Sequence, residues 1–162
     1  MLGENIHCGI LNKMKMEKEQ VLVRDNKGIF LKMFKRRLKA DFDFFEKSFF
    51  DYSEDKIKQY DRIVYVVYDK NELLGFLQQE NKNENILVCL FDKQFFTSLS
   101  FLEMINNLIL FDESKTSREV FKEVKTFFKK KLDFRNDRIS LQQLNFMQAK
   151  FPEYYKAMYY LM

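Results

Sequence analysis

Two short runs of this chain are apolar at almost every position, and they constrain the fold more than any other feature. Residues 63–68 read IVYVVY and residues 86–91 read ILVCLF, both rich in β-branched and aromatic side chains that favour strands. Because successive side chains of a strand point to opposite faces, both faces of these strands are apolar. A sheet that contains them must be covered on both faces, and helices from the flanking sequence are available to cover it.

Short polar connections around these runs predict an antiparallel meander. Residues 69–72 (DKNE) are expected to form a turn, residues 73–79 a second strand, and residues 81–85 a second turn. Residues 20–34 predict a hairpin whose turn is DNKG, with Gly28 at a left-handed position. We therefore expect an α+β fold, with an antiparallel meander sheet of three to five strands covered by four or five helices.

Helical spacing predicts the covering elements. In residues 38–60 the apolar side chains step by three and four residues, which places them on one face of a helix, and residues 95–110 carry a similar stripe. Thr116 and Glu119 match a capping box, in which each side chain accepts the backbone amide of the other residue. The helix that this box opens is expected to bury its apolar stripe, which is Val120, Val124, Phe127 and Phe128.

The length of the chain fits one domain. A domain of 162 residues buries roughly 70% of its unfolded surface, so it needs neither a disulfide nor a metal to fold. We expect residues 1–18 to be a loosely ordered N-terminal segment and residues 19–162 to form a single α+β domain. Cys8 and Cys89 have no disulfide or metal-ligand spacing. No signal peptide and no apolar run of about 20 residues is present, so we expect a cytoplasmic protein with no membrane partner.

Glycine and histidine are too scarce for several common kinds of active site. The four glycines lie at positions 3, 9, 28 and 75, which excludes a Walker loop and a G-x-G-x-x-G turn. His7 is the only histidine, so a catalytic triad or a histidine-ligated metal is not expected. Asp41 and Asp43 would point about 200° apart on a helix and could not share a metal. We predict no catalytic residue, no cofactor and no metal; whether the chain is an enzyme stays open, and these residues favour a non-enzymatic role.

Basic residues gather in two segments of the chain. Clusters of this kind suit phosphate contacts, which contribute to binding through counterion release. They equally suit solvated helix faces, with the run at 129–131 matching the negative end of a helix dipole. The first cluster is Lys32, Lys35, Arg36, Arg37 and Lys39, and the second is Lys122, Lys125, Lys129, Lys130 and Lys131, followed by Arg135 and Arg138.

The C-terminal residues combine helix signals with an excess of tyrosine and methionine. Residues 140–143 (SLQQ) match a second capping box, and Pro152 starts a last helix. The side chains of Tyr154, Tyr155, Met158, Tyr159 and Leu161 cannot all face one way on that helix. Core packing accounts for one face, and a partner surface for the other, because tyrosine and methionine are enriched at protein interfaces.

Residues 62–80 (RIVYVVYDKNELLGFLQQE), taken as a strand, a short turn and a strand beginning LLGF, resemble the second and third strands of the GNAT acyltransferase superfamily. The resemblance implies acetyl-CoA binding at a loop of the pattern Gln/Arg-x-x-Gly-x-Gly/Ala. Residues 94–99 and 115–120 are the places that could match, and neither contains the glycines that let backbone amides reach the pyrophosphate.

Three functions are therefore carried forward. The first is a non-enzymatic binding protein, of the inhibitor, immunity or accessory type found on mobile elements, that occupies the surface of a macromolecular partner, in the first instance another protein. The alternative is an acyl-CoA-dependent N-acyltransferase-like (GNAT-like) protein, active or degenerate. The third is nucleic-acid binding through the lysine clusters, and self-association stays open. The predicted partner-binding residues are Tyr154, Tyr155, Tyr159, Lys129, Lys130, Lys131, Arg36 and Arg37.

Overall fold

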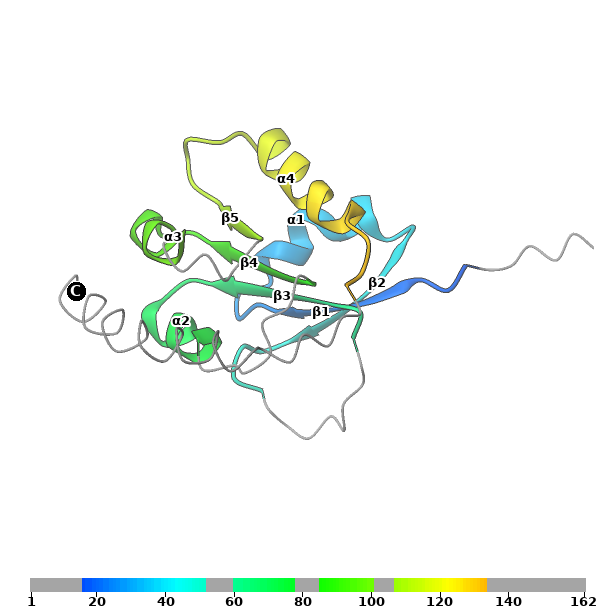
Figure 1. Cartoon of the computed structure of the whole chain (residues 1–162), viewed down its shortest axis with the longest axis horizontal. Helices are drawn as coiled ribbons and strands as arrows, with labels where there is room; N and C mark the ends of the chain where they lie inside the picture. Colours follow the sequence, from blue (N-terminus) through cyan, green and yellow to red (C-terminus); the bar gives the residue numbers. More distant parts are fainter. Residues whose placement is uncertain (1–15, 52–59, 78–84, 101–106, 134–162) are drawn as a thin grey trace, which may run out of the picture.

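The described part of the protein contains a sheet of five parallel strands (Figure 1). A computed structural model describes residues 16–51, 60–77, 85–100 and 107–133. The strands lie in the order β2-β1-β3-β4-β5, and every neighbouring pair is parallel. The predicted antiparallel meander is therefore wrong. The strands are β1 Glu19–Arg24, β2 Phe42–Lys47, β3 Arg62–Val67, β4 Ile86–Leu90 and β5 Leu108–Leu110.

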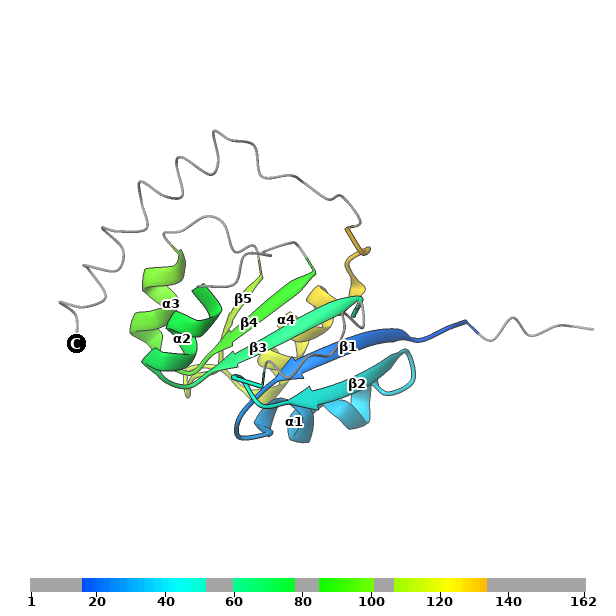
Figure 2. The same cartoon turned by 90° about the horizontal axis from the view of Figure 1, so that it is seen from below.

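Helices cover both faces of this sheet, as the two apolar strands require. Helices α1 and α4 lie on one face, and α2 and α3 lie on the other (Figures 1 and 2). The expected strands at residues 63–68 and 86–91 are confirmed as β3 and β4, which occupy the interior of the sheet. The helices are α1 Ile29–Leu38, α2 Lys70–Leu77, α3 Lys93–Ser100 and α4 Ser117–Lys129.

The stretch expected to be the middle strand of the meander is helix α2. Asp69 Oδ1 accepts the Glu72 amide at 2.9 Å, and Glu72 Oε2 accepts the Asp69 amide at 3.4 Å, which is the reciprocal pattern that opens a helix. Leu73, Phe76 and Leu77 then fall three and four residues apart and are buried. A helix here carries the chain back across the sheet, so β3 and β4 run parallel. It also removes the strand on which the resemblance to GNAT acyltransferases rests.

Three other expected elements differ from the structure for a related reason. The left-handed Gly28 is confirmed, with φ of 67°, but helix α1 follows it in place of the second arm of a hairpin. Strand β2 lies inside the predicted helix over residues 38–60, and β5 lies inside the predicted helix over residues 95–110. In the last two cases a short apolar run satisfied helical spacing while the tertiary fold buried it as a strand.

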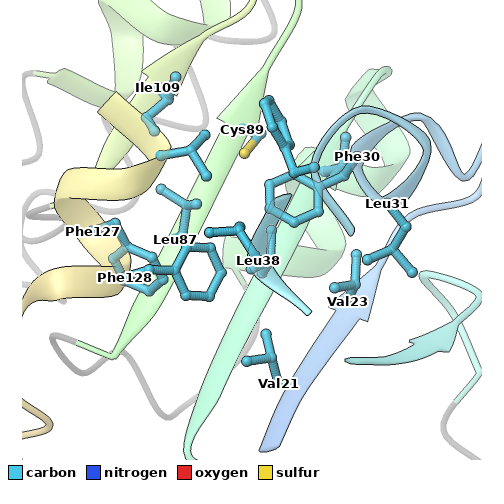
Figure 3. Close-up of a cluster of buried hydrophobic side chains, with 14 of the residues drawn as sticks. Val21, Val23, Phe30, Leu31, Leu38, Leu87, Cys89, Ile109, Phe127 and Phe128 are labelled. Atoms are coloured by element: carbon cyan, nitrogen blue, oxygen red, sulfur yellow. The ribbon is translucent and has the colours of Figure 1, made fainter. Parts of the chain in front are cut away.

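The core consists of two layers of side chains, one on each side of the sheet. On the α1–α4 side, Val21, Leu87 and Cys89 of the strands pack against Phe30 of α1 and Phe127 of α4 (Figure 3). On the α2–α3 side, Tyr65, Val67 and Val88 are buried with side chains of those two helices. The alternation along β3 and β4 explains why both runs are apolar throughout. Burial raises the pKa of the Cys89 thiol, as expected for a small apolar side chain rather than a reactive one.

The capping box at the start of α4 is confirmed. Thr116 accepts the Glu119 amide, and the Glu119 carboxylate accepts the Thr116 amide at 2.7 Å. The four expected core residues of α4 are all buried. The second capping box at residues 140–143 and the helix after Pro152 lie outside the described residues. The division between residues 1–18 and 19–162 stays a prediction.

A buried arginine fixes the far end of α4 to the sheet. Arg62, at the start of β3, is 1% exposed, and its Nε lies 2.6 Å from Glu19 Oε2. Its guanidinium also donates to the carbonyl oxygens of Phe127 at 3.2 Å and Lys130 at 2.5 Å. Both carbonyls lie at the C-terminal end of α4, where a helix leaves carbonyls without their usual donors, and the Phe127 oxygen also accepts the Lys130 amide at 3.2 Å. One side chain therefore joins β1, β3 and α4.

We expect Arg62→Met to lower the free energy of unfolding by about 3 kcal/mol, because it removes the buried guanidinium that donates to Glu19 and to the carbonyls of Phe127 and Lys130. The value falls at the lower end of the usual range for a broken buried pair because the Glu19 side chain is 33% exposed. Urea unfolding of the wild type and the variant measures the difference. Lys93→Met, at an exposed position of α3, is the control and should change stability by less than about 0.5 kcal/mol. An equally small effect of Arg62→Met would contradict this role.

Candidate functional site

The carboxyl edge of the sheet is where this topology is expected to place a ligand site. In open sheets with this strand order, ligands bind outside the carboxyl ends of the strands, where the order reverses. Here the reversal lies between β1 and β3. Asp25 and Asn26 follow β1 directly, and Tyr68 and Asp69 follow β3. These four polar residues therefore meet at the position where this topology would place chemistry.

The Asp25 carboxylate is held by three donors of the protein itself. Its side chain is buried, and it accepts the amides of Lys27 at 3.0 Å and Phe30 at 2.9 Å and the hydroxyl of Tyr68 at 2.6 Å. Gly28 is the N-cap of α1 and has no side chain to accept a helix amide, so Asp25 supplies that acceptor. Burial and the hydrogen bond to Asp25 raise the pKa of the Tyr68 hydroxyl. The carboxylate therefore joins β1, α1 and β3.

A second group of bonds ties the same edge to α2 and to the connection after β2. The Asn26 amide donates to Glu72 Oε1 at 2.5 Å, and Asn26 Oδ1 accepts the Phe49 amide at 2.7 Å. The other oxygen of Glu72 accepts the Tyr68 amide at 2.6 Å. Glu72 is 2% exposed, so its charge is buried among these donors. Asp25, Asn26, Tyr68 and Glu72 form one hydrogen-bonded network, which we call the edge network.

The carboxylates at the ends of β4 and β5 also accept backbone amides. Asp92 Oδ1 accepts the amides of Gln94 at 2.7 Å and Phe95 at 3.2 Å, which opens α3. Asp112 accepts the amide of Ser114 at 3.0 Å as well as its hydroxyl, and these bonds lower the pKa of Asp112. Across the described ranges, no group of three or more histidine, cysteine, aspartate or glutamate residues is arranged to hold a metal ion. The polar groups at this edge begin helices and turns.

The residues of this edge were missed by sequence reasoning, although a repeated signal was present. After each of β3, β4 and β5 the chain continues with an aromatic residue and then an aspartate. The aromatic rings pack in a row, with centroids 4.9 Å apart for Tyr68 and Phe91 and 5.3 Å apart for Phe91 and Phe111. The aspartates are the helix and turn acceptors described above. A repeated aromatic–aspartate pair after apolar runs therefore marks the strand ends of this sheet.

Tyr68→Phe tests the edge network through its pH dependence. At neutral pH we expect the variant to lose about 1–3 kcal/mol of stability, because the Asp25 carboxylate loses a buried donor. The raised pKa means that the folded protein keeps the Tyr68 proton at pH values where the unfolded chain, near pH 10.0, releases it. Stability from Tyr68 is therefore present below pH 10 and falls as the pH rises above it.

The measurement is urea unfolding of the wild type and Tyr68→Phe between pH 7 and pH 11. The difference in stability between the two proteins should shrink above pH 10. A difference that stays constant across this range would contradict the proposed role of the hydroxyl.

The second candidate surface is formed by the two helices on one face of the sheet. Helices α1 and α4 lie side by side (Figures 1 and 2), and the Phe34 ring of α1 stacks on the Phe121 ring of α4 with centroids 6.0 Å apart. The Arg37 guanidinium lies 4.7 Å from the centroid of the same Phe121 ring. These contacts bring together two basic clusters that are more than eighty residues apart in the sequence.

The outer side of these helices is strongly and almost uniformly positive. The whole chain carries 28 lysines and arginines against 24 aspartates and glutamates, a net charge of only +4. Helix α1 with the residue after it, to position 39, and helix α4 with the two residues after it, to position 131, carry eleven of those basic residues and only two glutamates. We call the following exposed residues the basic face: Lys32, Lys35, Arg36, Arg37, Lys39, Arg118, Lys122, Lys125, Lys129, Lys130 and Lys131.

The five predicted partner-binding residues that the structure describes all belong to this face. Arg36 and Arg37 lie in the last turn of α1, Lys129 ends α4, and residues 130 and 131 follow it. Both helices end at the amino edge of the sheet, where Lys18 donates to the Lys39 carbonyl at 2.9 Å and Arg62 to the end of α4. The remaining predicted residues, Tyr154, Tyr155 and Tyr159, lie outside the described residues, as do Arg135 and Arg138.

One member of the basic face also has a structural contact. Lys130 Nζ donates to Asn107 Oδ1 at 2.6 Å, although the lysine is exposed. The two residues help to line an open cavity of about 210 Å³ between β4, β5 and α4. Ligand sites usually have volumes of roughly 300–1,000 Å³, so this cavity is small for an organic ligand. The Lys130 ammonium group is therefore less available for contact with a partner than those of Lys129 and Lys131.

No helix in the described ranges is long and apolar enough to cross a membrane. Comparison with known proteins found no matching family model and no matching curated protein. Among solved structures, the chain is similar to the receiver domain of ChxR from Chlamydia trachomatis, with 16% sequence identity and a TM-score of 0.43. The similarity covers 70% of this chain and 100% of that domain.

Proposed function

We propose that this chain is a non-enzymatic binding protein that acts by occupying the surface of a macromolecular partner, with the basic face as its contact surface. The observation that carries the proposal is the juxtaposition of α1 and α4, which joins two separate clusters into one field of positive charge. The edge network supports the same proposal, because its carboxylates hold backbone amides and a tyrosine hydroxyl where an enzyme of this topology would hold its substrate.

The charge of the basic face defines the kind of partner. Complementary charge steers association and selects against partners of like sign, and its effect weakens as salt rises. The two glutamates of α4 do little to reduce the positive field. Glu119 belongs to the capping box, and Glu123 Oε1 lies 2.7 Å from Lys115 Nζ. We therefore expect a partner with a strongly negative surface.

Affinity capture from an extract of the source cells tests the proposal. Lys32→Gln/Lys125→Gln removes one charge from each helix of the basic face, at exposed positions. We expect this variant, the face variant, to retain roughly fivefold less partner than the wild type, since each exposed ionic contact contributes up to about 1 kcal/mol.

The matched control is Lys70→Gln/Lys93→Gln, which removes the same charge from α2 and α3 on the opposite face. The control should retain as much partner as the wild type, and thermal melting should show all three proteins folded. Equal retention by the face variant and the wild type would contradict the proposed contact surface.

A further inference from the structure

We propose that the basic face binds double-stranded nucleic acid through its phosphate backbone, without reading base sequence. The inference rests on the proposed function and names the class of partner. Some lysines of the basic face lie at positions that the helix dipole does not explain. The dipole acts within the last turn, which accounts for Lys35, Arg36 and Arg37 of α1 and for Lys129 of α4. Lys32, Lys122 and Lys125 lie before those turns and are exposed.

Exposed cations of α1 and α4 are available to a ligand. Within the part of the chain that the structure describes, Lys32, Lys35, Arg36, Lys122 and Lys125 form no ion pair. The described ion pairs instead use Lys18, Arg62 and Lys115. Repulsion among these unpaired cations is relieved when a polyanion neutralises them, and the released counterions add to the binding free energy.

The spacing of the cations suits a regular polyanion. Lys122, Lys125 and Lys129 recur at intervals of three and four residues along the outer side of α4, as Lys32, Lys35 and Lys39 do along α1. With a rise of about 1.5 Å per residue, each row places a charge roughly every 5 Å. Packed helices lie about 8–10 Å apart, so the two rows form a broad field over a rigid layer. Evenly spaced phosphates match such a field better than the irregular carboxylates of a protein surface.

The residue types indicate contact with phosphates rather than with bases. Eight of the eleven residues of the basic face are lysines, which bind phosphate as point charges, whereas specific base contacts most often use arginine. Recognition of single strands depends on exposed aromatic rings on which bases stack. On the described part of this face the Phe121 ring is half-buried between Phe34 and the Arg37 guanidinium. A duplex, held through its backbone, fits these features.

Fluorescence anisotropy with labelled 20-base-pair DNA tests the proposal. The full chain is titrated against two duplexes of unrelated sequence and one single strand, between 50 and 200 mM salt. We expect micromolar affinity, the same for both duplexes and weaker for the single strand. In a plot of log affinity against log salt, the face variant should reduce the slope by about 2, since each phosphate contact contributes roughly 0.9. The Lys70→Gln/Lys93→Gln control should leave the slope unchanged.

Three results would overturn the inference. The first is no duplex binding at 50 mM salt, the second is an unchanged salt slope in the face variant, and the third is poly-L-glutamate competing as well as unlabelled duplex. If any of these occurs while the face variant still loses its captured partner, the proposed function stands and the partner is an acidic protein. If the face variant captures its partner normally, the proposed function fails independently of the DNA measurement.

Discussion

The rest of the structure depends on the Asp25 carboxylate and its three donors. By accepting the Phe30 amide it supplies the cap that Gly28 lacks, and so determines where α1 begins. Along α1, Phe30 and Phe34 are buried against the sheet, and Lys32 and Arg36 are exposed. By accepting the Tyr68 hydroxyl, the same carboxylate joins β1 to β3 across the reversal of strand order. One buried carboxylate thus joins the sheet edge to the start of the helix that carries part of the basic face.

Much of the sheet could be predicted from the sequence, but the relative direction of its strands was predicted wrongly. The apolar runs at residues 63–68 and 86–91 identify β3 and β4 and require helices on both faces, and both expectations are confirmed. Strands apolar on both faces are typical of parallel sheets, so the signal for direction was present. It was outweighed by reading residues 73–79 as a strand. The eight residues of α2 have apolar side chains at positions 73, 74, 76 and 77, a pattern too short to distinguish a helix from a strand. The capping bonds between Asp69 and Glu72 favour the helix.

The candidate surface could be predicted only in part. Arg36, Arg37 and the lysines at 129–131 were identified from their clustering, but their proximity depends on the contact of Phe34 with Phe121, which local sequence does not encode. The edge network was missed because its residues do not cluster in the sequence. Its residues are scattered as Asp25, Asn26, Tyr68 and Glu72, and only a parallel sheet brings them to one edge. Interpreting the chain as a meander therefore obscured this network.

Chemical-shift mapping tests the central claim most directly, namely that α1 and α4 carry the contact surface while the edge network is structural. Backbone amide shifts of the isotopically labelled full chain would be followed during titration with a short DNA duplex. The account predicts that the largest changes fall on residues 30–39 and 118–131, with small changes at Asp25, Tyr68 and Glu72. Changes concentrated at those three residues, with α1 and α4 unaffected, would contradict it.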